Sequence, residues 1–86
     1  MDDGEFEWND VKAAANIAAH GVSFEAAKLV FEDPFAIEFL DQGDYGEERF
    51  NIIGMVEGRI LFVAYTLRGD KIRIISARGA EPYERR

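Results

Sequence analysis

The chain has 86 residues, of which 48% are hydrophobic and 13% aromatic, and its formal net charge is −7. This length fits a single domain spanning residues 1–86, and the apolar content argues against intrinsic disorder. With no cysteine, no apolar run near the ~20 residues that cross a bilayer and an acidic N-terminus unlike a secretory signal, we expect a soluble cytoplasmic protein without disulfides or membrane attachment.

The first half of the chain predicts a short strand followed by two helices. Apolar and polar residues alternate over Phe6–Trp8, as in a strand. Asn9 is a good N-cap for an alanine-rich helix over residues 10–20. Ser23 caps a second helix, which we place over residues 24–33.

The second half predicts strands, because it is rich in Ile, Val, Phe and Tyr. Two-residue turns at 57–58 and 69–70 connect the last three strands as hairpins, and residues 80–86 begin a short helix. The fold class is therefore α+β, with an N-terminal strand, two helices, an antiparallel meander and a short C-terminal helix. The expected strands are 35–40, 49–56, 59–67 and 71–78.

The two tight turns fix a register for the meander. They pair position 66 with 73 and 64 with 75, and they pair 49 with 66 and 51 with 64. One face then becomes nearly all apolar and should pack on the helices. That face holds Phe50, Ile52, Val56, Leu61, Val63, Tyr65, Leu67, Ile72 and Ile74.

The same register places Arg49, Thr66 and Arg73 in one row on the other face. Because neighbouring strands hold facing residues about 5 Å apart, the two arginines lie ~10 Å apart and can converge on one phosphate. Arg78 follows on the strand of Arg73 and can bind an adjacent phosphate. The alternative is that Arg49 and Arg73 pair with nearby Glu48 or Asp70 on a solvated sheet, and a single bulge would break the row.

Charge is distributed unevenly along the chain. Residues 1–48 hold 13 acids and two bases, whereas residues 49–86 hold eight bases and four acids. A net-acidic protein can still bind nucleic acid where its basic residues gather on one face, because the electrostatic potential of that face, not the net charge, determines binding. Ordinary solvated surface on both halves is the alternative.

Lys12, Asn16 and His20 recur every four residues and form a polar stripe on the first helix. His20 is either a general base or phosphate contact, or a cap on the helix C-terminus. Glu84 is a weaker candidate for a base or a salt-bridge partner. We find no metal-ligand cluster, phosphate-binding glycine loop or nucleophile–base motif, and we expect no cofactor.

Several segments in order resemble the BrnT family of toxins. FEWNDVKAAANIAAHGVSFEAAKLVFEDP opens the similarity at Phe6, and GEERFNIIGMVEGRILFVAYTLRGDKIRIISAR followed by ERR completes it. The resemblance covers nearly the whole chain.

The resemblance implies a RelE-like fold and a metal-independent ribonuclease that arrests translation, in which the 2′-hydroxyl of the RNA attacks. It also implies a BrnA-like antitoxin with a DNA-binding domain, so that operator DNA is reached only through the antitoxin, and RNA that is free or ribosome-associated. The catalytic residues we expect are Arg49, Arg73, Arg78 and His20. The RNA-binding residues we expect are Lys12, Arg68, Arg85 and Arg86.

The sequence departs from the family pattern in two places. Ala18 and Ala19 stand where the family has basic residues, and residues 79–83 are less basic than usual. Both departures weaken cationic binding. The alternative function is therefore a non-catalytic partner and co-repressor of the antitoxin; a small enzyme with another substrate is a third possibility.

Overall fold

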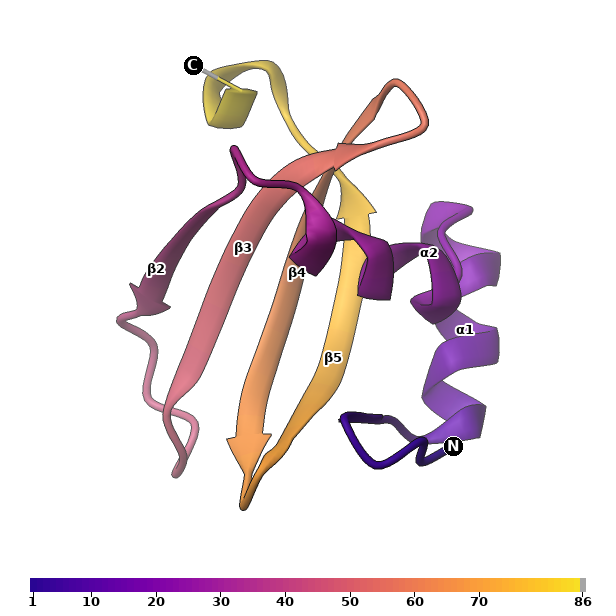
Figure 1. The fold of residues 1–86 in the computed structure, drawn as a ribbon, viewed down its shortest axis with the longest axis vertical. Helices are drawn as coiled ribbons and strands as arrows, with labels where there is room; N and C mark the ends of the chain where they lie inside the picture. The colour runs from indigo at the N-terminus through magenta and orange to yellow at the C-terminus, as the bar shows by residue number, and fades with distance from the viewer. Residues whose placement is uncertain (86) are drawn as a thin grey trace.

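An open five-stranded sheet with helices packed on one face makes up the fold (Figure 1). The computed structural model describes residues 1–85, and for Arg85 only the backbone. The elements are β1 (Phe6–Glu7), α1 (Asp10–His20), α2 (Phe24–Leu29), the 3₁₀ turn η1 (Val30–Glu32), β2 (Ile37–Asp41), β3 (Arg49–Val56), β4 (Arg59–Arg68), β5 (Lys71–Gly79) and the 3₁₀ turn η2 (Pro82–Arg85).

The sheet is mixed rather than wholly antiparallel. Its strand order is β1-β5-β4-β3-β2, and the meander from β2 to β5 is antiparallel as predicted. The first strand instead runs parallel to β5, with Phe6 opposite Ile72 and Glu7 opposite Arg73. Parallel neighbours need a long connection rather than a hairpin, and here the whole intervening chain supplies it.

The helix caps lie where the sequence predicts them. The Asn9 side chain accepts the Lys12 backbone N–H at 3.0 Å, and the Ser23 hydroxyl accepts that of Ala26 at 3.0 Å. Gly21 ends α1 in the left-handed region with φ 67°, where glycine has no Cβ to clash. These caps produce the predicted tight connection between the two helices.

The segment after α2 differs from the prediction. The second helix ends at Leu29 and continues only as the turn η1, and β2 starts at Ile37 rather than at residue 35. The Asp33 carboxylate accepts the backbone N–H groups of Phe35 at 2.9 Å and Met55 at 2.7 Å. These hydrogen bonds fix the loop to β3, and β2 therefore begins two residues later than predicted.

The core lies between the helices and one face of the sheet. Phe24, Val30, Ile52 and Val63 are its largest fully buried side chains, and Trp8 meets Phe24 edge-to-face at 5.7 Å between ring centres. Most of the predicted apolar face is buried or half-buried. Leu67 is the exception at 56% exposed, near the β4–β5 hairpin that projects past the helices in Figure 1.

A bulge in β5 changes the predicted register. Thr66 pairs with Arg73 and Asn51 with Ala64, as expected. Position 64, however, pairs with Ser76 rather than with Ile75, because Ile75 is an extra residue in β5. The bulge turns Arg78 to the face of the sheet away from the helices, opposite Phe62. We call this face the open face.

The open face carries exposed apolar side chains near its β2 edge. Ile37, Phe39 and Met55 all belong to the exposed class, and Phe39 meets Phe62 edge-to-face at 6.1 Å between ring centres. Among residues 1–85, no helix is long and apolar enough to cross a membrane.

Candidate functional site

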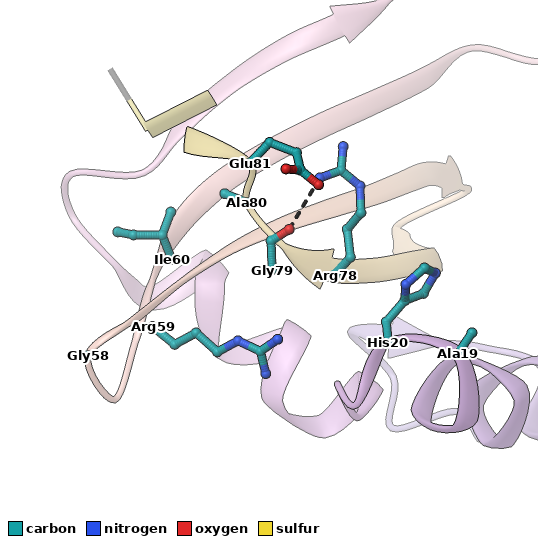
Figure 2. Close-up of a pocket in the computed structure, with 9 residues that line it drawn as sticks. All are labelled: Ala19, His20, Gly58, Arg59, Ile60, Arg78, Gly79, Ala80 and Glu81. Atoms are coloured by element: carbon teal, nitrogen blue, oxygen red, sulfur yellow. Dashed lines mark hydrogen bonds between the residues drawn. The ribbon is translucent and has the colours of Figure 1, made fainter. Parts of the chain in front are cut away.

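A pocket of about 670 Å³ lies at the end of the sheet where β5 finishes (Figure 2). Its wall comes from the end of α1, from the β3–β4 turn with the start of β4, and from the end of β5. We call it the His20 pocket. Its lining residues are Ala19, His20, Gly58, Arg59, Ile60, Arg78, Gly79, Ala80 and Glu81.

Buried Asn16 places His20 at this pocket. Its side-chain amide donates to the Ala77 carbonyl at 2.7 Å and accepts the Ala77 N–H at 3.1 Å, and it also donates to the Val22 carbonyl at 2.9 Å. Helix α1 is therefore fixed to β5 one residue before Arg78. His20, one turn further along the helix, reaches the end of the same strand.

Arg59 is a pocket cation that the sequence prediction missed. It begins β4 directly after a tight turn in which Glu57 (φ 50°) and Gly58 (φ 80°) both have positive φ. Its guanidinium passes over Gly79, where an added Cβ would lie 3.1 Å from Arg59 Nη2. The usable signal was a glycine near the end of a strand, where a bulky neighbour needs room.

Arg78 is held in place by several contacts. Arg78 donates hydrogen bonds to the Glu84 carboxylate from Nη1 at 2.7 Å and from Nη2 at 2.9 Å. Its Nη1 also donates to the Gly79 carbonyl at 3.2 Å. The Phe62 ring lies beneath the guanidinium, 4.4 Å from Cζ to the ring centre. Pairing with Glu84 raises the pKa of Arg78, and the same hydrogen bonds lower the pKa of Glu84.

The pocket side chains occupy two sides of β5. In Figure 2, His20 and Arg59 lie on one side of the strand, whereas the Arg78 guanidinium extends on the other side, near Glu81. The pocket thus wraps around the end of the strand. A bound chain that follows it meets cationic groups on both sides.

The predicted row of Arg49, Thr66 and Arg73 lies at the opposite end of the open face. Thr66 and Arg73 are paired, while the β3–β4 pairing ends one step before Arg49, at Phe50 and Tyr65. Thr66 is buried, and its hydroxyl donates to the Glu48 carbonyl at 2.6 Å. The polar character of this row is therefore partly structural.

Both arginines of the row have carboxylate partners. Arg73 Nη1 donates to Glu7 Oε2 at 3.3 Å. Arg49 Nε lies 3.5 Å from Glu47 Oε2 without hydrogen-bond geometry, and its Cζ lies 4.0 Å from the centre of the Tyr45 ring. The partners are thus Glu7 and Glu47. Glu7 comes from β1, whose parallel pairing the sequence did not reveal.

The row and the pocket are separate sites. Their partners on β4, Thr66 and Phe62, are four residues apart, so Arg73 and Arg78 lie about 13 Å apart along the sheet at ~3.3 Å per residue. This spacing is too wide for both to bind one phosphate.

The other predicted RNA-binding residues are dispersed. Lys12 is exposed in the first turn of α1, about 12 Å from His20 at ~1.5 Å rise per residue. Arg68 ends β4 and is exposed, far from the pocket at the strand's other end. The Arg85 side chain and Arg86 lie outside the described part of the chain.

Comparison with known families decides the identity. Residues 8–84 match the family described as "Ribonuclease toxin, BrnT, of type II toxin-antitoxin system". The chain belongs to the BrnT family. No curated protein matches the sequence significantly. The BrnT family is one of ribonuclease toxins in type II toxin-antitoxin systems, which implies an antitoxin partner.

Proposed function

We propose that this BrnT protein is an active endoribonuclease that cleaves RNA at the His20 pocket and so inhibits translation. One observation carries the proposal: three separate elements bring His20, Arg59 and Arg78 to one pocket. An imidazole beside guanidinium groups supplies both a proton acceptor and fixed positive charge for a phosphodiester. The family's description as a ribonuclease supports this chemistry.

The proposed reaction uses the RNA's own 2′-hydroxyl as the attacking group. His20 accepts its proton while the oxygen bonds to the adjacent phosphorus, and the bond from phosphorus to the 5′-oxygen breaks. The products are a 2′,3′-cyclic phosphate and a 5′-hydroxyl, whose oxygen takes up a proton from water, and His20 returns its proton to the solvent. Arg59, on the same side of β5 as His20, stabilises the charge that grows on the phosphate oxygens, and Arg78 on the other side of the strand binds an adjacent phosphate. No metal ion or cofactor takes part.

We assign Arg49 and Arg73 to binding a neighbouring length of RNA on the open face. Arg73 lies about 13 Å from Arg78 along the sheet, at ~3.3 Å per residue, which suits a chain that crosses the sheet rather than a second contact to the same phosphate. A bound strand then enters at this row and reaches the pocket at the far end of β5.

The test compares pocket variants with a row variant under single-turnover conditions. Removing His20 (His20→Gln) or Arg59 (Arg59→Ala) is expected to lower the cleavage rate about a hundredfold, because each loses a contact used in the transition state. Arg73→Ala is expected to weaken RNA binding with a smaller effect on that rate. Lys28→Ala, on α2, is the control. A hundredfold loss in Arg73→Ala with full activity in His20→Gln would move the chemistry to the row.

The antitoxin is the second part of the proposal. We infer a BrnA-like partner that carries the DNA-binding domain, reaches operator DNA for the complex, and places an Asp- and Glu-rich segment over Arg49, Arg73 and Arg78. The toxin-antitoxin family supports such a partner. The order of strand, helices and antiparallel meander supports a RelE-like fold.

The non-catalytic alternative makes a different prediction. The carboxylate partners of Arg49, Arg73 and Arg78 are the observation that favours it, since each lowers the free positive charge. A purified, folded protein that binds the antitoxin and leaves RNA intact would establish a co-repressor role.

A further inference from the structure

The contact between Arg78 and Glu84 has the geometry of a bound phosphate. Two carboxylate oxygens meet two guanidinium nitrogens at 2.7 and 2.9 Å. This fork-to-fork arrangement is the one in which arginine binds phosphate oxygens. At the other arginine pairs of the open face, Arg73 with Glu7 and Arg49 with Glu47, a single nitrogen lies 3.3 and 3.5 Å from the carboxylate.

We propose that Arg78 is a phosphodiester-binding site whose place Glu84 occupies in the free protein, so that RNA must displace the C-terminal turn η2 to reach it. This inference rests on the proposed function, because it takes RNA as the ligand. The competing group is the Glu84 carboxylate, and the segment that moves is η2.

The guanidinium of Arg78 is already oriented for a phosphate to replace the Glu84 carboxylate. Phe62 lies beneath it, and the Gly79 carbonyl holds Nη1 from the strand itself. Neither contact depends on η2. The guanidinium therefore keeps its orientation when the carboxylate leaves, and a phosphate meets two donors already in position.

The turn η2 is built to separate from the sheet as a unit. The backbone N–H of Ala80 donates to the Ile60 carbonyl at 3.0 Å, which fixes the chain just before the turn. Within the turn, Glu84 Oε1 also accepts the Glu81 N–H at 2.7 Å, and Tyr83 is exposed. Among the side chains that the structure describes in this turn, Glu84, only 10% exposed, forms the polar contact with the strand through Arg78.

A tethered carboxylate competes with RNA at high effective concentration, so removing it strengthens binding without adding a contact. A glutamate carboxylate is already ionised at neutral pH, and its hydrogen bonds to Arg78 lower the pKa of Glu84 further. The carboxylate therefore competes with RNA at neutral pH.

The experiment measures binding of a short 2′-O-methyl oligonucleotide, which carries RNA-like phosphates and cannot be cleaved through its 2′-position. Glu84→Gln is expected to bind about tenfold tighter than the native protein. Glu57→Gln, on the β3–β4 turn, is the matched control, since it removes the same charge at this end of the sheet but no hydrogen bond to Arg78. Its effect should be at most about twofold, the part owed to net charge alone.

The double variant Glu84→Gln/Arg78→Ala shows whether the gain passes through Arg78. It should bind no tighter than Arg78→Ala. Glu84→Ser repeats the test with a side chain that cannot span the distance, and thermal melting verifies that each variant is folded. Equal binding by the Glu84 and Glu57 variants, or a gain that persists without Arg78, overturns the proposal.

Cleavage of unmodified RNA separates this inference from the proposed function. Tighter oligonucleotide binding by Glu84→Gln without any cleavage would keep the Arg78 site and reject the ribonuclease. Cleavage with no gain in binding would keep the ribonuclease and reject the Glu84 competitor.

Discussion

Asn16 is the residue that joins the two halves of the proposed site. Its three hydrogen bonds to Val22 and Ala77 fix the end of α1 against the end of β5. The spacing of Lys12, Asn16 and His20 indicated correctly that they share one helix face. Periodicity does not tell which member of a stripe lies against the sheet, so the sequence left the structural role of Asn16 unseen.

Replacing Asn16 tests this structural role. Asn16→Ala leaves buried backbone groups of Ala77 and Val22 without partners, and we expect a loss of about 3 kcal/mol in the free energy of unfolding. Removing the N-cap with Asn9→Ala should cost about 1 kcal/mol, because the affected N–H groups are reached by water. Urea unfolding of both variants gives the comparison. Equal losses would mean that Asn16 does not hold helix and strand together.

Strand β5 sets the chemistry of the site at the scale of an element. The hairpin turns in the sequence correctly predicted the pairing of Thr66 with Arg73, because two-residue turns fix register. They could not reveal the bulge at Ile75. Continued without it, the register would face Arg78 into the core, and an uncompensated charge there is costly. Two observable signs were Ala77, small enough for the core, and the charged residue directly after it.

Deleting Ile75 tests the bulge. Without this extra residue a regular β5 keeps Ala77 opposite Val63 and Arg78 opposite Phe62, so every later residue keeps its face. We therefore expect a loss of only about 1 kcal/mol in the free energy of unfolding. Inserting one alanine before Ala77 instead turns Arg78 toward the helices, and it should cost more than about 3 kcal/mol or prevent folding. Urea unfolding of both variants gives the comparison, and a deletion variant as unstable as the insertion variant would contradict this position of the bulge.

At the scale of the whole molecule, acidic side chains from the first half of the sequence form ion pairs with basic side chains from the second half. Glu7 meets Arg73, Glu47 meets Arg49, and Asp2 meets Lys71, so acids of the first half neutralise bases of the last strands. Composition predicted the asymmetry but not the pairs made by Glu7 and Asp2, since these depend on β1 lying parallel to β5. The open face combines these arginines with exposed Phe39.

Antitoxin association should therefore have two separable components. Steering by Arg49 and Arg73 is screened over about 8 Å at physiological ionic strength, so added salt should slow association far more than it speeds dissociation. Arg49→Ala and Arg73→Ala should reduce that salt dependence. Phe39→Ser removes apolar contact instead, and it should mainly raise the dissociation rate. Stopped-flow mixing at two salt concentrations, with Lys12→Ala as the control, measures both rates. Association indifferent to salt and to the arginines would place the antitoxin on another surface, such as the exposed side of α1.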